Sequence, residues 1–197
     1  MKAADLQLID RLTDDLGGVF ALSDLKVLFG AQTEASLYKK LQSCIGEGVL
    51  IKVKRGFYAR PDASLRTVSA RICPNSYVSL GTVLADSAII GSVPGRRVQA
   101  VKVGVPRRFT CSLGTIEFLS ITPRLFFGVS LVDGIGLATP EKAFLDACYF
   151  TFKGRKLSFD IDTDVDRSRL DSGVLEQYLT EYDSRFVAFY RRITDDG

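Results

Sequence analysis

The sequence contains no histidine. Without this side chain the protein cannot build a Ser-His-Asp or Cys-His catalytic site, a His-ligated zinc or haem site, or the usual general base near neutral pH. The four cysteines, Cys44, Cys73, Cys111 and Cys148, are widely spaced and form no C-x-x-C pair. This spacing excludes a zinc knuckle and a thioredoxin-type couple. Their apolar neighbours are typical of buried thiols in a reducing cytoplasm.

The sequence also lacks a long apolar segment. No stretch approaches the ~18 uncharged residues that a membrane-spanning helix needs. The first residues run directly into an amphipathic pattern, without the apolar centre of a signal peptide. We therefore expect a cytoplasmic protein with no membrane partner.

Composition and charge are those of a globular protein with an uneven surface. The chain has 197 residues, of which 46% are hydrophobic and 25% charged, enough for one large or two small domains. The net charge is +2 over residues 1–60, +5 over 61–125 and −4 over 126–197. This asymmetry indicates one face that binds an anion and another that binds something else; the alternative is drift between solvated surfaces.

The first sixty residues predict three helices and a hairpin. Leu6, Ile9, Leu12 and Leu16 recur at helical spacing before Gly17-Gly18. Ser23 is the expected N-cap of a second helix that ends at Gly30. Thr33 is the expected N-cap of a third helix, which runs to about Gly46.

The third helix has an apolar face and a polar, basic face. Leu37, Leu41, Cys44 and Ile45 fall within one arc and predict the core side. The remaining positions are short polar residues and lysines, which suit a helix that enters a major groove of DNA. The expected contacts from this helix are Ser36, Tyr38, Lys39, Lys40, Gln42 and Ser43. The alternative is an ordinary solvated helix face.

A basic hairpin follows directly. Residues 49–54 alternate, with Lys52 and Lys54 facing outward, and Arg55-Gly56 forms the predicted turn before residues 57–60 return. Three helices and a basic hairpin are the order of a winged helix-turn-helix, with the wing over the DNA backbone or minor groove. A winged helix used only for protein contacts is the alternative.

The rest of the chain predicts a second, larger domain. Expected helices cover residues 62–72, 77–85 and 171–193, with another that begins after the N-cap Thr139. Expected strands cover residues 98–103, 109–113, 115–121 and 124–131. The predicted fold class is therefore α+β, with a winged helix-turn-helix at residues 1–60 and a mixed α/β domain with an antiparallel sheet at residues 61–197.

Three short motifs in this order carry a family resemblance. They are Lys54-Arg55-Gly56-Phe57-Tyr58 at the wing, Tyr77-Val78-Ser79-Leu80, and Ala138-Thr139-Pro140-Glu141-Lys142-Ala143 at a helix start. With the basic strand region between them, they resemble the AbiEi family, the antitoxins of bacterial type IV toxin–antitoxin systems. The resemblance covers about residues 19–152, and residues 153–197 add nothing to it.

The resemblance implies a winged helix that binds operator DNA and represses its own operon, and a C-terminal domain that counteracts a nucleotidyltransferase-like toxin. It implies DNA contacts for Lys39, Lys40, Lys52, Lys54 and Arg55. A second basic patch, Arg96, Arg97, Arg107 and Arg108, lies at predicted strand entrances on one edge. These arginines either extend the DNA surface, which we favour slightly, or serve neutralisation.

No catalytic, metal or cofactor site is expected. The acids from Asp160 to Asp166 alternate as in a calcium loop, but the required glycine and bidentate glutamate are missing, so a charged edge strand is favoured. Gly91-Ser92 lacks the Asp-x-Asp pair of a nucleotidyltransferase. The alternatives are a ligand-responsive regulator unrelated to a toxin and a metal-dependent nuclease that uses Asp146, Asp160 and Asp162.

Overall fold

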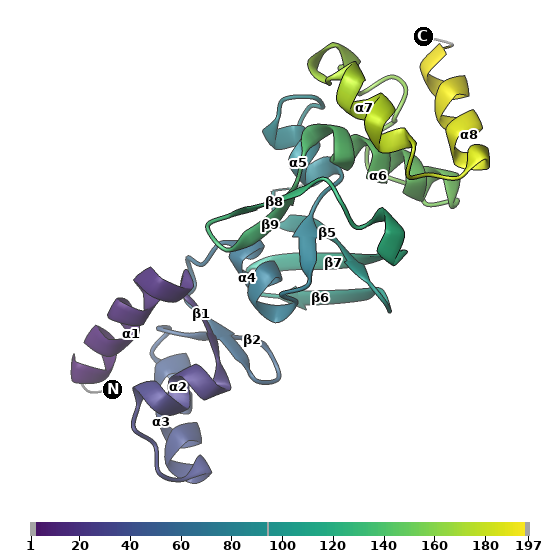
Figure 1. The fold of residues 1–197 in the computed structure, drawn as a ribbon. Helices are drawn as coiled ribbons and strands as arrows, with labels where there is room; N and C mark the ends of the chain where they lie inside the picture. The colour runs from purple at the N-terminus through teal and green to yellow at the C-terminus, as the bar shows by residue number, and fades with distance from the viewer. Residues whose placement is uncertain (1–2, 94, 196–197) are drawn as a thin grey trace. The chain divides into compact units, whose positions relative to one another are not determined.

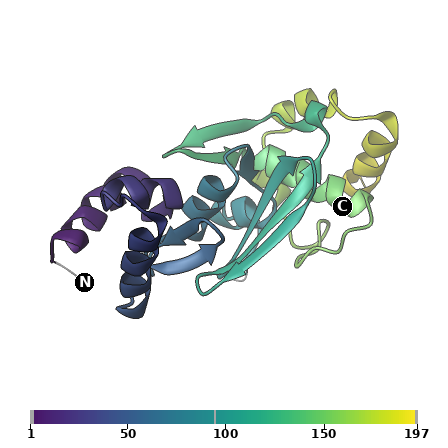
Figure 2. The same cartoon turned by 90° about the horizontal axis from the view of Figure 1, so that it is seen from below.

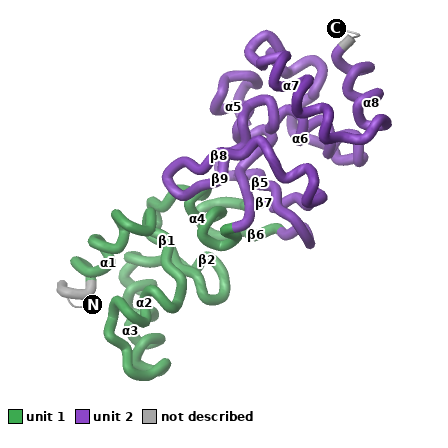
Figure 3. Tube along the Cα trace, in the orientation of Figure 1, with its two compact units in different colours: residues 1–74, 108–116 green, residues 75–107, 117–197 purple. Residues whose placement is uncertain are grey.

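The computed structural model describes residues 3–93 and 95–195, which divide into two compact units (Figures 1 and 3). The first unit contains residues 1–74 and 108–116, and the second contains residues 75–107 and 117–197. The fold class is α+β, as predicted, with a winged helix-turn-helix at the N-terminus and a mixed sheet after it.

The first unit has the helix and strand order of a winged helix. Its elements are α1 (Ala3–Leu16), β1 (Val19–Ala21), α2 (Leu22–Leu28), α3 (Glu34–Gly46), β2 (Ile51–Lys54), β3 (Phe57–Ala59) and α4 (Leu65–Ile72). The strands form an antiparallel sheet in the order β1-β3-β2. Figures 1 and 2 show this small sheet beside helices α1 to α3 from two directions. The short apolar run after the first helix is thus a strand.

One apolar cluster holds the three helices and the sheet together. Ile9 of α1, Leu25 of α2, Leu37 and Leu41 of α3 and Tyr58 of β3 are buried in it. Ile9 of α1 and Leu37 and Leu41 of α3 lie on the apolar helix faces that their spacing predicted. Burial of this apolar surface is the main force that fixes α3 on the sheet.

The N-cap of the second helix lies two residues before the predicted one. It is Ala21, not Ser23. The Asp24 carboxylate accepts a hydrogen bond from the Ala21 N–H at 2.8 Å, and so satisfies a free amide at the helix start. The prediction of Ser23 as the N-cap was wrong, because the side chain that stabilises this helix start is Asp24, three residues after the actual N-cap Ala21. The Thr33 cap of α3 is confirmed, since its side chain accepts from the Ser36 N–H.

Helix α4 groups with the winged helix, whereas the sequence placed the domain boundary at residue 60. The Asp24 carboxylate that caps α2 also accepts a hydrogen bond from Arg71 of α4, at 2.7 Å. Val68 of α4 is fully buried, and α4 contacts β1. These contacts extend the first compact unit to Pro74.

The larger sheet is mixed, and all of its residues belong to the second unit except residues 108–116, which belong to the first. The strands are β4 (Ser76–Val78), β5 (Arg97–Val103), β6 (Arg107–Cys111), β7 (Gly114–Ile121), β8 (Val129–Val132) and β9 (Ile135–Ala138), and the sheet order is β6-β7-β5-β4-β9-β8. Strand β4 pairs antiparallel with β5 and parallel with β9, and β8 pairs antiparallel with β9. The strands predicted at 98–103 and 115–121 are confirmed as β5 and β7.

Two of the predicted elements differ in the structure. Residues 77–85, predicted as one helix, form the end of β4 and then helix α5 (Gly81–Asp86), because β4 is held between two strands. The chain changes direction at Leu80, whose φ of 52° lies in the left-handed region. The strand predicted at 124–131 begins only at Val129, as β8, and a 3₁₀ turn (Pro123–Leu125) takes the place of its first residues.

Helices pack beside this sheet within the second unit. Helix α6 (Pro140–Phe152) contacts α5, α7 (Ser172–Leu179), α8 (Ser184–Asp195) and β9. The predicted N-cap is confirmed, because the Thr139 side chain accepts from the Lys142 N–H. The helical segment predicted at 171–193 is confirmed as α7 and α8.

The charged edge strand expected around Asp160–Asp166 is wrong. Residues 161–164 form a turn in which the Asp160 carboxylate accepts from the N–H groups of Asp162 and Thr163. Ile161 and Val165 are buried and anchor the turn. Aspartate side chains can accept hydrogen bonds from nearby backbone N–H groups that would otherwise pair in a strand. The alternation of acidic and apolar residues therefore belongs to a turn here and not to a strand.

Candidate nucleic-acid interface

The outward face of α3 carries the side chains that the sequence assigned to DNA. Lys39 and Gln42, three residues apart, are exposed, while Leu37 and Leu41 are buried beneath them. Tyr38 is 46% exposed, which leaves its hydroxyl free to reach solvent or a ligand. The exposed members of the set are Ser36, Tyr38, Lys39 and Gln42. They form a continuous polar strip along one side of the helix.

The side chains of two other α3 residues form hydrogen bonds to groups of their own unit. Lys40 donates a hydrogen bond to the Phe29 carbonyl at 3.2 Å, and its ammonium lies 5.1 Å from the centre of the Phe29 ring. Ser43 donates to the Glu47 carboxylate at 2.7 Å. Lys40 thus ties α3 to the C-terminal end of α2, where a cation interacts favourably with free carbonyl groups.

The wing presents its cations at the turn. Gly56 has a φ of 79°, which only glycine adopts readily, and with Arg55 it closes the two-residue turn. Lys52 and Arg55 are exposed. The Lys54 ammonium instead lies over the rings of Phe57 and Phe109, at 4.7 and 5.2 Å. The pairing shifts between Lys52 and Lys54, a bulge that turns these two lysines differently.

The four arginines of the second basic patch are in different settings. Arg96 and Arg97 stand at the start of β5, and Arg107 and Arg108 at the start of β6. The seven residues of β5 carry the chain about 20 Å from Arg97 before the turn to Arg107. Arg107 and Arg108 are exposed, but Arg97 is part of an ion-pair cluster inside its own unit.

That cluster is centred on Glu117 of β7. Its carboxylate accepts hydrogen bonds from Arg97 at 2.7 Å and from Arg155 at 2.5 Å. Burial alone raises the pKa of Glu117, but the two hydrogen bonds and the two positive charges outweigh it and hold the pKa below its ordinary value. Arg97 is therefore committed to a structural pair.

This cluster predicts an acid-sensitive contribution to stability. Because the folded-state pKa of Glu117 is depressed, the contribution is complete above the unfolded value of about 4.5 and is lost as the pH falls through the folded value. Glu117→Gln is expected to lower the free energy of unfolding by about 1 kcal/mol at pH 7, since both arginines are partly solvated. Urea unfolding measures the loss in the free energy of unfolding at pH 7 and at pH 3.5, where a smaller loss is expected. Glu176→Gln, at an exposed pair with Arg191, is the control; an equal loss from Glu117→Gln at both pH values would contradict the account.

A fully buried charge pair lies in the second unit, and one of its members is the lysine of the Thr-Pro-Glu-Lys-Ala motif. Lys142 and Asp146, one turn apart on α6, are both 0% exposed and form an ion pair. The other carboxylate oxygen of Asp146 accepts from the Tyr77 hydroxyl at 3.0 Å and from the Ser79 hydroxyl at 2.7 Å. Lys142 also donates to the Tyr182 hydroxyl at 3.3 Å. We refer to these five residues as the polar core.

The polar core is surrounded by aromatic rings. The Lys142 ammonium lies 4.9 Å from the centre of the Phe127 ring and within 6 Å of the rings of Tyr77 and Tyr182. Burial, reinforced by the Asp146 charge, raises the pKa of both tyrosines, so both stay neutral and available for hydrogen bonds. Burial of Lys142 could not be predicted from the sequence, because lysine is rarely buried.

The residues of the nuclease alternative do not form a site. Asp146 is enclosed in the polar core, whereas Asp160 and Asp162 are exposed in their turn. Within residues 3–93 and 95–195, no three acidic or cysteine side chains are grouped so that they could hold a metal ion. Over the same described residues, no helix is long and apolar enough to cross a membrane.

Comparison with known proteins yields a structural match but no family. No protein-family model and no curated protein matches the chain. The crystal structure of the RV2827C protein from Mycobacterium tuberculosis superimposes with a TM-score of 0.64 at 13% sequence identity, over 99% of this chain and 77% of that one. The two chains share a fold. At this identity the match carries no residue roles, so function has to be argued from the side chains described above.

Proposed function

We propose that the chain is a DNA-binding transcriptional autorepressor that acts as the antitoxin of a type IV toxin–antitoxin pair. The observation that supports DNA binding is the combination of a winged-helix order with exposed Lys39 on α3 and exposed Lys52 and Arg55 on the wing. Lysine and arginine at these two places reach phosphates on either side of a groove, while Ser36 and Gln42 carry groups that bond base edges.

The antitoxin part of the proposal rests on the resemblance to the AbiEi family. The most specific motif of that resemblance, Thr139 to Ala143, includes the cap of α6 and the buried Lys142. In this proposal the second unit counteracts a nucleotidyltransferase-like toxin, and the protein has no catalytic activity or cofactor of its own. A neighbouring gene that encodes such a toxin would be the simplest support.

Two assays test the two halves separately. Binding to a labelled fragment of the protein's own promoter measures the DNA function, and a promoter reporter measures repression. Growth of cells that express the neighbouring toxin, with and without this chain, measures neutralisation. If the chain does not bind its own promoter at low salt, the proposed repressor function is wrong. If it does not restore growth, the proposed antitoxin function is wrong.

The salt dependence of binding is expected to be steep. If about six basic side chains contact phosphates, the logarithm of the affinity falls with a slope of roughly −5 against the logarithm of the salt concentration, because each contact releases condensed counterions. Fluorescence anisotropy with a promoter duplex between 50 and 200 mM salt measures the slope. A flat isotherm over this range would contradict the phosphate contacts.

A further inference from the structure

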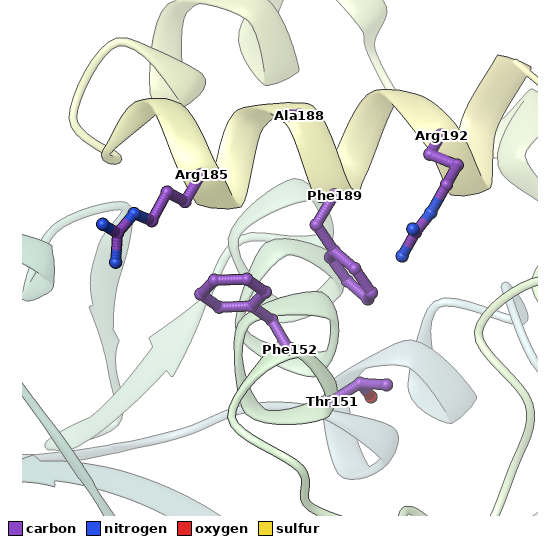
Figure 4. A pocket seen from close by; sticks show the side chains of 6 residues that line it. All are labelled: Thr151, Phe152, Arg185, Ala188, Phe189 and Arg192. Carbon is purple, nitrogen blue, oxygen red and sulfur yellow. The ribbon is translucent and has the colours of Figure 1, made fainter.

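An open hollow lies between the end of α6 and helix α8. It has a volume of about 480 Å³ and is lined by Thr151, Phe152, Arg185, Ala188, Phe189 and Arg192. Figure 4 shows the rings of Phe152 and Phe189 at its centre, with Arg185 and Arg192 on either side. The ring centres are 5.4 Å apart. We call this surface the α8 groove.

The spacing along α8 gives the groove its shape. Arg185, Ala188 and Arg192 stand at positions i, i+3 and i+7, which lie on one helix face, and all three are exposed. The two arginines are about 10.5 Å apart along the helix axis. Alanine between two long side chains leaves a dent, and the half-buried Phe152 and Phe189 supply its apolar floor.

The groove is locally positive. Among the residues whose side chains the structure describes, no carboxylate forms an ion pair with Arg185. Arg192 rests 5.7 Å from the centre of the Phe189 ring, and the ammonium of Lys153 lies over Phe152 at 5.8 Å. Exposed cations beside an aromatic floor are typical of the centres of protein interfaces, where arginine and aromatic residues are enriched.

From this geometry we infer that the α8 groove docks an acidic amphipathic helix of a partner protein. Two carboxylates seven residues apart on such a helix have the same spacing as Arg185 and Arg192, and an apolar side chain midway between them fits over Ala188. The small alanine lets the partner helix approach to the 8–10 Å between axes at which helices pack.

A nucleic acid fits this surface less well than a helix. The third of the chain that contains the groove, residues 126–197, has a net charge of −4. Glu181 and Asp183 are exposed just before α8. A long polyanion would approach these acids as well as the arginines, whereas two discrete carboxylates meet only the cations. Docking of a protein helix in the α8 groove does not depend on DNA binding by the chain.

A synthetic peptide tests the inference on the full-length chain. The probe is an amidated, fluorescent helical peptide with two glutamates seven positions apart and two leucines between them. The unmodified chain is expected to bind it, and the Arg185→Glu/Arg192→Glu variant is expected to bind at least about tenfold more weakly, because like charges then face each other. The same variant is expected to bind a peptide with lysines in place of the glutamates better than the unmodified chain does. Ala188→Trp, which fills the dent, is expected to weaken binding of the glutamate peptide to a similar degree.

Arg191→Glu is the matched control, since Arg191 lies on the same helix but pairs with Glu176. It changes the charge of α8 by −2, half the change in the Arg185→Glu/Arg192→Glu variant, and is expected to retain binding within about twofold. Absence of binding at millimolar peptide, or binding that none of the groove variants changes, would overturn the inference. Tighter binding of a twelve-nucleotide single-stranded RNA than of the peptide, lost in the Arg185→Glu/Arg192→Glu variant, would overturn the choice of a protein partner.

Discussion

Replacing Asp146 by asparagine is expected to lower the free energy of unfolding of the second unit by about 3–5 kcal/mol, because the ammonium of Lys142 is then buried without a counter-charge. Asparagine keeps an oxygen that can accept from the Tyr77 and Ser79 hydroxyls, so the loss reports the charge and not the hydrogen bonds. Urea unfolding at pH 7, followed by circular dichroism, gives the value.

The matching variants show whether the charges act as a pair. Lys142→Met alone leaves the carboxylate of Asp146 buried and uncompensated, and is expected to cost a similar amount. The Lys142→Met/Asp146→Asn double variant removes both charges and is expected to recover at least half of either single loss. Single losses below about 1 kcal/mol, or losses that simply add in the double variant, would contradict the coupling described for the polar core.

Removing the exposed cations of the winged helix is expected to lower affinity for promoter DNA by at least about 100-fold at low salt. The Lys39→Ala/Lys52→Ala/Arg55→Ala variant loses three charge-assisted contacts, each with a typical contribution of 1.5–3 kcal/mol. Its fold should be retained, since all three side chains point outward. Fluorescence anisotropy measures the affinity, and the growth assay is expected to show neutralisation largely intact.

Two controls separate a defined interface from general electrostatics. Arg11→Ala/Lys26→Ala removes exposed charges from α1 and α2 and is expected to change affinity by less than about fivefold. Lys40→Ala is expected to lower the melting temperature, because Lys40 bonds the Phe29 carbonyl, and to leave the salt slope nearly unchanged. An equal loss in the Arg11/Lys26 variant would argue against α3 and the wing as the interface.

The winged helix was predictable because its signals are local. The apolar face of α3, the Thr33 cap and the Arg55-Gly56 turn each depend on residues a few positions apart, and the structure confirms all three. Strand β4 was missed because its evidence is not local. Three residues form a strand only where partners exist, and Val78 pairs with Leu137, far along the chain.

In the candidate site, too, the features that depend on distant residues could not be predicted from the sequence. The sequence identified the cations but not the groups that they bind. Lys40 and Lys54 looked like Lys39 and Lys52, yet the first two lie against aromatic rings of their own unit. Arg97 looked like Arg107, yet it pairs with Glu117. Which cation stays free depends on tertiary neighbours, and charge alone does not determine them.

The polar core also sets an order for folding during translation. The apolar cluster of the winged helix spans Ile9 to Tyr58, so all its members emerge early from the ribosome. The polar core needs Tyr77, Lys142, Asp146 and Tyr182, which are distributed over most of the remaining chain. At about 5–20 residues per second, Tyr182 follows Tyr58 by roughly 6–25 seconds. During that interval a nascent chain carries all members of the apolar cluster of the winged helix but not all members of the polar core. A stop codon before Tyr182 is therefore expected to release a protein whose N-terminal domain is native and whose C-terminal part is open to proteases.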